Sequence, residues 1–211
     1  MAAGKFTRAA AELLRILGVD RSAIVGGIAV NVHGYARATR DVDVMTAMPL
    51  AEALRRLREH GVEARLFKGD PLAGHFDCLK GILPVGRRAV DAVPFDVLPP
   101  LEAVTPERTV ELVVKGQRLR VVDQETLFRL KLRAGGTNDL YDIAILVGLH
   151  PQWESRVVAL ASGRGKEAAE RLMGLLRDPR VRAQVKEVKR QDRELRAFSK
   201  RTRPVKGPRS H

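Results

Sequence analysis

Two aspartates one residue apart, Asp41 and Asp43, stand in the stretch Asp-Val-Asp-Val, whose alternating polar and apolar residues are typical of a β-strand. In an extended strand alternate side chains share a face, and residues two apart are separated by about 6.6 Å. We therefore expect both aspartates to point the same way, while Val42 and Val44 point into the core. Two carboxylates at this spacing repel each other unless a cation lies between them. They can flank the pair of divalent ions used in two-metal phosphoryl transfer.

The residue types near this strand indicate which cation and which ligand it would serve. Oxygen ligands without a nearby Cys or His pattern favour Mg²⁺ over zinc, with Mn²⁺ as a substitute. Upstream, Gly26 and Gly27 separate an apolar segment, expected as a strand at 22–25, from a short helix expected at 28–35. Glycines in such a place let backbone N–H groups approach a phosphate closely. An ordinary strand–helix turn remains the alternative for the glycines, and a solvated edge strand remains the alternative for the aspartates.

The whole segment GGIAVNVHGYARATRDVDV, residues 26–44, resembles the signature of the DNA polymerase β-like nucleotidyltransferase superfamily. More narrowly, its glycines, His-Gly pair, Arg-x-Thr and D-x-D are similar to the AbiEii-type nucleotidyltransferases of abortive-infection and toxin–antitoxin systems. The strong similarity covers about twenty residues, and a weaker one continues to about Leu146. The resemblance implies a nucleotidyltransferase fold, an NTP substrate and two magnesium ions.

The resemblance also implies a third carboxylate on a neighbouring strand, which would complete the metal site with Asp41 and Asp43. Asp96, in the stretch VPFDVLPP, is the best match, and Asp91 and Asp77 are its rivals. Pro94 stands in the same stretch, and proline is disfavoured in central strands. We expect Asp41, Asp43 and Asp96 to be the catalytic and metal-binding residues.

The same resemblance supplies a set of nucleotide-binding residues, which are Gly26, Gly27, Arg37, Thr39, Arg40 and Lys131. The guanidinium forks of Arg37 and Arg40 suit phosphate oxygens or an RNA backbone, although a structural salt bridge to the aspartates is the alternative. Lys131 is expected to reach the triphosphate, with a surface lysine as the alternative.

Two further aspartates and a histidine near these residues are expected to have supporting roles. Asp139 and Asp142 would orient the helix that carries Lys131, or Lys131 itself. His33 is expected to be packed and hydrogen-bonded, because metal-assisted transfer needs little proton chemistry from a side chain.

The elements that must position these residues form an α/β (α+β) pattern. Apolar spacing predicts helices at 6–17 and 48–60, strands at 62–67, 76–83 and 92–98, and a hairpin of 109–114 with 118–122 turning at 115–117. From Asp123 onward the spacing is helical, and Asp123 and Asn138 are predicted to cap the first two of these helices. We expect a nucleotidyltransferase-fold mixed sheet with flanking helices at 1–122, a C-terminal helical region at 123–198 and a disordered basic tail at 199–211.

Charge and composition limit the classes of partner that we expect for this protein. Lys and Arg outnumber Asp and Glu by 38 to 25, a net charge of +13, which favours a polyanionic partner. Aromatic residues make up 4% of the chain, which argues against base stacking as the main grip on single strands. The single cysteine, Cys78, excludes an internal disulfide. The N-terminal segment is interrupted by charges and the chain has no apolar run of about 20 residues, so we expect a cytoplasmic protein without a membrane span.

The function that these residues predict is transfer of an NMP from an NTP to a hydroxyl group of RNA, such as a tRNA end, or of a protein. The AbiEii-type similarity adds a role as the toxin of a toxin–antitoxin system, with an antitoxin protein as partner. A catalytically silent module of the same fold is one alternative. A basic RNA-binding protein with an accidental D-x-D is the other.

Overall fold

The computed structural model describes residues 2–70, 76–86, 91–114 and 116–201. Within these residues seven strands form one mixed sheet, in the order β3-β4-β5-β2-β1-β7-β6. β2 runs parallel to β5 and β1 runs parallel to β7, whereas the other neighbours are antiparallel. The strands are β1 (Ser22–Ile24), β2 (Val42–Thr46), β3 (Glu63–Phe67), β4 (Cys78–Pro84), β5 (Ala92–Leu98), β6 (Thr109–Val114) and β7 (Gln117–Val122).

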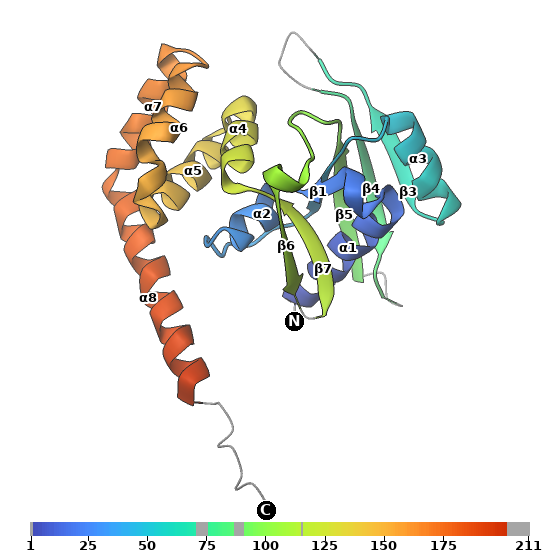
Figure 1. The fold of residues 1–211 in the computed structure, drawn as a ribbon, viewed down its shortest axis with the longest axis horizontal. Helices are drawn as coiled ribbons and strands as arrows, with labels where there is room; N and C mark the ends of the chain where they lie inside the picture. The colour runs from blue at the N-terminus through green and yellow to red at the C-terminus, as the bar shows by residue number, and fades with distance from the viewer. Residues whose placement is uncertain (1, 71–75, 87–90, 115, 202–211) are drawn as a thin grey trace, which may run out of the picture.

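Helices flank this sheet and then follow it along the chain (Figure 1). Three are interleaved with the strands: α1 (Ala2–Leu17), α2 (Gly26–Val32) and α3 (Leu50–Glu59). The others are α4 (Gln124–Ala134), α5 (Thr137–Leu149), α6 (Glu154–Ser162), α7 (Lys166–Arg177) and α8 (Pro179–Arg201). Short 3₁₀ turns lie at Val19–Arg21, Pro106–Arg108 and Pro151–Trp153. α1 packs against β1, β2 and β7, and α3 packs against β3. In Figure 1, α8 continues past the other helices toward the C-terminus.

One face of β2 and β5 is buried, and this shows which side chains of these strands point to the opposite face. Val42 and Val44 have no exposed surface and pair in register with Phe95 and Val97 of β5, which are also buried. The prediction that both valines point into the core is confirmed. Since successive side chains of a strand alternate between faces, Asp43 and Asp96 point to the opposite face.

The mixed α/β architecture and the helical C-terminal region are confirmed. Pro94 lies in β5, a central strand, although proline is disfavoured there. β2 pairs with β5 only from Phe95 onward, so Pro94 stands where β5 has β4 as its partner but not β2. The missing N–H of the proline therefore breaks no bond of the β2–β5 ladder. The predicted hairpin of β6 and β7 is also confirmed, and its turn residue 115 lies outside the described residues.

The two predicted helix caps have different outcomes. The Asp123 side chain accepts a hydrogen bond from the backbone N–H of Thr126 at 2.7 Å, so this N-cap is confirmed. The cap at Asn138 is wrong, because α5 begins at Thr137, two residues before the start that this cap would give, and its N-cap is Gly136. The preceding Gly135 ends α4 in a left-handed conformation (φ 67°), and the next helix starts directly after this glycine pair.

The C-terminal helix α8 runs to Arg201, three residues into the segment expected as a tail, and residues 202–211 lie outside the described part. None of the helices in the described residues is long and apolar enough to cross a membrane.

Candidate active site

Asp43 and Asp96 are direct cross-strand neighbours, because β2 and β5 run parallel with Asp43 in register with Asp96. Paired residues of adjacent strands point to the same face, so both carboxylates face the same side of the sheet. Asp41 precedes β2, and its carboxylate accepts a hydrogen bond of 3.4 Å from the Thr39 hydroxyl.

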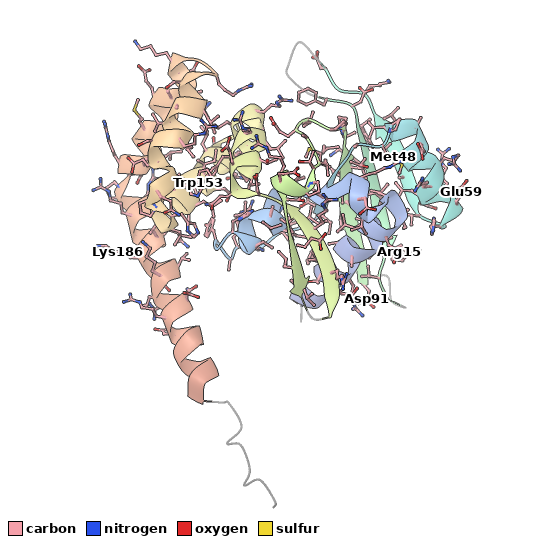
Figure 2. All side chains as sticks on the ribbon, in the orientation of Figure 1. Arg15, Met48, Glu59, Asp91, Trp153 and Lys186 are labelled. Atoms are coloured by element: carbon pink, nitrogen blue, oxygen red, sulfur yellow. The ribbon has the colours of Figure 1, made fainter. Side chains whose placement is uncertain are left out.

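The rival carboxylates are engaged elsewhere. Asp77 pairs with Lys68 at 2.8 Å and accepts a bond from the backbone N–H of Gly69. Asp91 precedes the first residue of β5, against Gly86, at the lower end of the sheet in Figure 2. Of the three candidates, Asp96 is the one that the strand register places beside Asp43.

The glycine pair approaches this site so closely that a side chain does not fit. Both glycines belong to the first turn of α2, which begins at Gly26, two residues earlier than the helix expected at 28–35. A Cβ on Gly26 would lie 1.8 Å from Oδ2 of Asp43, and its φ of 60° is in the left-handed region. A Cβ on Gly27 would lie 2.6 Å from the Thr39 hydroxyl. The absence of side chains on Gly26 and Gly27 therefore lets α2 begin directly against Asp43 and Thr39.

The carboxylates of Asp41 and Asp96 lie close enough to affect the ionisation of Asp43. The pKa of Asp43 is raised from 3.8 to about 7, first by burial and then by the negative charges of Asp41 and Asp96. The positive charge of Lys131 and the backbone N–H of Gly27 act against this rise. The site therefore holds an excess of negative charge that an added cation would relieve.

The donors here fit a hard divalent cation. Three carboxylates supply oxygen ligands, which Mg²⁺ prefers. Cys78 lines the adjoining cavity, but burial raises the pKa of its thiol, which keeps it protonated and disfavours zinc. Among the described residues no three His, Cys, Asp or Glu side chains form a ready-made metal cluster. One reason is visible at Asp96, whose Oδ2 is 2.6 Å from the ammonium of Lys80.

Four charged side chains form a partly buried network between the sheet region and the C-terminal helices. Arg37 binds Asp142 through two bonds, Nε to Oδ1 at 2.8 Å and Nη2 to Oδ2 at 2.7 Å. Lys131 lies 2.8 Å from both Asp139 and Asp142. Lys131 is 5% exposed and Asp142 is 2% exposed, so Lys131 is not the surface lysine of the alternative reading. Asp139 and Asp142 hold Lys131 in the way the sequence predicts.

The bidentate contact of Arg37 corresponds to a structural ion pair, the alternative left open by the sequence, although its partner is Asp142 rather than Asp41 or Asp43. Arg40, by contrast, is exposed and has no acidic partner among the described residues. His33 is hydrogen-bonded to the carbonyl of Val122 at 2.8 Å, and burial lowers its pKa, as expected for a packed histidine.

A cavity of about 500 Å³ lies over these residues, between the sheet and α4. Gly26, Asp43 and Lys131 line its polar end. Its apolar part is formed by side chains of the sheet, its loops and α4, which include Phe76, Leu98, Leu101, Leu127 and Leu130. The volume is in the range of pockets that hold small molecules.

Lys80 and Arg133 were not predicted as site residues from the sequence. Lys80 is in register with Asp96 across β4 and β5, and the hydrogen bond between them raises the pKa of Lys80. Arg133 lies over the ring of Phe76, 5.7 Å from its centroid, at the edge of the cavity. Lys80 could have been found from the sequence only if the pairing of β4 with β5 were known, because this pairing places Lys80 beside Asp96.

Comparison with solved structures supports a nucleotidyltransferase fold for this mixed sheet and its helices. No protein-family model matches the sequence, and no curated protein matches it. The structure is similar to that of an antigenic nucleotidyltransferase-like protein from Paracoccidioides brasiliensis, with a TM-score of 0.51 and 17% identity over 87% of this chain and 93% of that one. This likeness supports the fold alone.

Two further solved structures match at lower TM-scores. One is a putative nucleotidyltransferase from H. pylori, with a TM-score of 0.43 and 11% identity over 92% of this chain and 97% of that one. The other is ANT(2")-Ia in complex with adenylyl-2"-tobramycin, with a TM-score of 0.39 and 15% identity over 90% of this chain and 97% of that one.

Proposed function

We propose that the protein is a metal-dependent nucleotidyltransferase that moves an NMP from an NTP to a hydroxyl group of an acceptor. The observation that carries this proposal is the register of Asp43 with Asp96 on adjacent parallel strands, with Gly26 packed against Asp43. If the D-x-D were accidental, there would be no reason for Asp96 to lie beside Asp43, or for a glycine to stand at position 26, where a Cβ would clash with Asp43.

In this proposal Asp41, Asp43 and Asp96 hold two Mg²⁺ ions, which Mn²⁺ can replace. When bound, the ions lower the pKa of the acceptor hydroxyl and stabilise the leaving pyrophosphate. Burial and then the negative charges of Asp41 and Asp96 raise the pKa of Asp43, and a cation bound there would favour its ionised form.

The nucleotide is bound by the backbone of Gly26 and Gly27, by Thr39, and by the cationic side chains of Arg40 and Lys131. Arg40 is exposed and has no acidic partner among the residues that the structure describes, so it can take a phosphate. Lys131 lines the cavity while two aspartates fix its ammonium. Arg37 is assigned instead to holding Asp142, because its Nε and Nη2 already bind that carboxylate.

The transfer forms one bond and breaks one. The acceptor oxygen bonds to the α-phosphorus, the bond from that phosphorus to the bridging oxygen breaks, and pyrophosphate leaves with the electron pair. The hydroxyl proton passes to solvent. The residues contribute position and charge, which are the main requirements of phosphoryl-group chemistry.

RNA is the acceptor that the charge favours, with a tRNA end as one form and a protein hydroxyl as the second choice. The net charge of +13 supports a polyanion, because basic groups that neutralise phosphates release counterions. The AbiEii-type motif in residues 26–44 supports a further proposal, a toxin whose activity a partner antitoxin restrains. Expression of the wild type is then expected to slow growth, and expression of Asp43→Asn is not.

Incubation of the protein with each α-labelled NTP, Mg²⁺ and cellular RNA or lysate tests the proposal. The expected result is label on RNA or protein with wild type and none with Asp43→Asn. Asp77→Asn is the matched control, since Asp77 is paired with Lys68 away from the site, and it should keep wild-type labelling. Equal labelling by the wild type and Asp43→Asn would contradict the assigned site. Salt-dependent RNA binding without transfer, unchanged in Asp43→Asn, would favour the silent module or the basic RNA-binding protein.

A further inference from the structure

A second groove, of about 740 Å³, runs over β3 and β4, the two strands that precede β5 in the order of the sheet. We call it the β3–β4 groove and define it by Arg58, Glu63, Arg65, Phe67, Lys80 and Ile82, all of which line it. Nothing in the proposed nucleotide site uses these side chains. The groove is open to solvent, since Arg58, Arg65 and Lys80 are exposed and Phe67 and Ile82 are 48% and 56% exposed.

Strand pairing joins this groove to the carboxylates in one straight row. Arg65 of β3 is in register with Lys80 of β4, Lys80 with Asp96 of β5, and Asp96 with Asp43 of β2. Paired residues share a face of the sheet, and the contact of 2.6 Å between Lys80 and Asp96 agrees with this placement. Because neighbouring strands are about 4.8 Å apart, Arg65 lies about 14 Å from Asp43 along the row.

The charges in the groove suit an anionic chain. Arg58 and Arg65 have no acidic partner among the described residues, and the partner of Lys80 is Asp96 of the candidate site itself. Glu63 is the acidic residue of the groove lining. Phe67 shares the face of Arg65, two residues along β3, and Ile82 shares the face of Lys80 on β4.

Cationic side chains interleaved with exposed apolar ones are what single-stranded nucleic acid requires. The cations contact backbone phosphates, and the apolar surfaces contact bases that a duplex would keep stacked. With Phe67 as the aromatic member, charge rather than stacking supplies most of the grip. This agrees with the low aromatic content of the chain.

On the basis of the proposed function, we propose that the β3–β4 groove binds the single-stranded 3′ end of an RNA acceptor and leads its terminal hydroxyl to Asp96 and Asp43. Arg58 and Arg65 contact phosphates upstream of the terminal nucleotide. Lys80 stands between the groove and the carboxylates, and its flexible stem lets the ammonium move from Asp96 to the last phosphate of the acceptor.

Photocrosslinking tests the direction of the strand without requiring turnover. The full chain is mixed with a short oligouridine that carries 4-thiouridine at its 3′ end, without NTP or metal, and crosslinked peptides are identified by mass spectrometry. The expected crosslinks of the 3′ label fall on β4 and β5, whereas those of a label placed a few nucleotides upstream fall on β3 and the end of α3. Crosslinks confined to the basic helix α8, from either label, would overturn the proposal.

Binding by matched variants provides the second test. At low salt Arg65→Gln is expected to bind the same oligouridine about threefold to tenfold more weakly, and its salt slope should fall by about one. Arg55→Gln is the control, because Arg55 is an exposed arginine of α3 that pairs with Glu59 outside the groove, and it should bind like wild type. Equal binding by Arg65→Gln and wild type would contradict the proposal. A second contradicting result would be displacement of the RNA by a polyglutamate peptide from wild type but not from Arg65→Gln. The groove would then be a protein-binding surface.

The labelled-NTP assay separates the two proposals. Label transferred to protein but never to RNA would contradict the proposal that the groove binds RNA, and it would still support the proposed nucleotidyltransferase activity. Groove-dependent RNA binding without transfer on any acceptor would overturn the nucleotidyltransferase and leave the RNA-binding surface standing.

Discussion

Replacing Asp43 by asparagine should increase the stability of the metal-free protein at neutral and alkaline pH. The pKa of Asp43 is about 7 in the folded state against 3.8 for a free aspartate, mainly because the side chain is buried beside two other carboxylates. Between these values the unfolded state has lost the proton and the folded state keeps it, so the free energy of unfolding falls as pH rises. Since one pKa unit corresponds to about 1.4 kcal/mol, the wild type loses up to about 4 kcal/mol between pH 4 and pH 7. Asp43→Asn lacks this loss.

The measurement is urea denaturation of wild type and variant at several pH values, followed by circular dichroism. The quantity of interest is the difference between their free energies of unfolding, because titrations common to both proteins cancel. The variant is expected to gain steadily on the wild type from pH 4 to pH 7 and then to keep a constant advantage. Asp77→Asn is the control with the opposite sign, because the hydrogen bond from Lys68 lowers the pKa of Asp77. A pH-independent difference for Asp43→Asn would refute this account of the site.

Magnesium should narrow this difference in stability, because a bound cation offsets the negative charge of the carboxylates. At a free Mg²⁺ concentration ten times the dissociation constant, wild type should gain about 1.4 kcal/mol. Asp43→Asn should gain much less at the same concentration. If Mg²⁺ stabilised both proteins equally, the cation would be bound elsewhere.

Three further substitutions test the surroundings of the site. Asp142→Asn should lower the free energy of unfolding by about 3 kcal/mol in urea denaturation, because it removes the carboxylate shared by the buried Lys131 and the half-buried Arg37; a loss below about 1 kcal/mol would show that the network is not stabilising. Asp123→Ala should cost about 1 kcal/mol in the same assay through loss of the α4 N-cap, and no change would contradict that assignment. Gly26→Ala should abolish the Mg²⁺ stabilisation while the circular dichroism spectrum is kept, because its Cβ would displace the carboxylate of Asp43. Gly18→Ala, with a similar positive φ but nothing within 4 Å of the added Cβ, should keep that stabilisation.

Local patterns in the sequence were sufficient for the strands and for one helix cap. The alternation of Asp41 to Val44 predicts which side chains are buried, and the apolar stretch around Asp96 predicts the neighbouring strand. Both follow from the two-residue period of a strand, which needs no knowledge of the rest of the chain. The cap at Asp123 is equally local, since its acceptor and donor are three residues apart.

The contacts that complete the site join residues that are distant in sequence, so spacing could not predict them. Lys80 and Asp96 are 16 residues apart, and Arg37 and Asp142 are 105 residues apart. Their pairing depends on the strand order and on where α5 packs. Asn138 was assigned wrongly for a different reason, because Gly135 and Gly136 set the boundary between α4 and α5 through backbone conformation rather than through a capping side chain.

The contact of Arg37 with Asp142 restricts how this chain could be divided. Arg37 comes before the strand that carries Asp43, whereas Asp142 is 2% exposed and lies in the helical region. A fragment that stops after β7 would leave the guanidinium without its counter-ion, and the helices alone would bury an acid with one fewer partner. We therefore expect that neither half folds independently. A truncated or rearranged gene should yield a soluble product only when it encodes both halves.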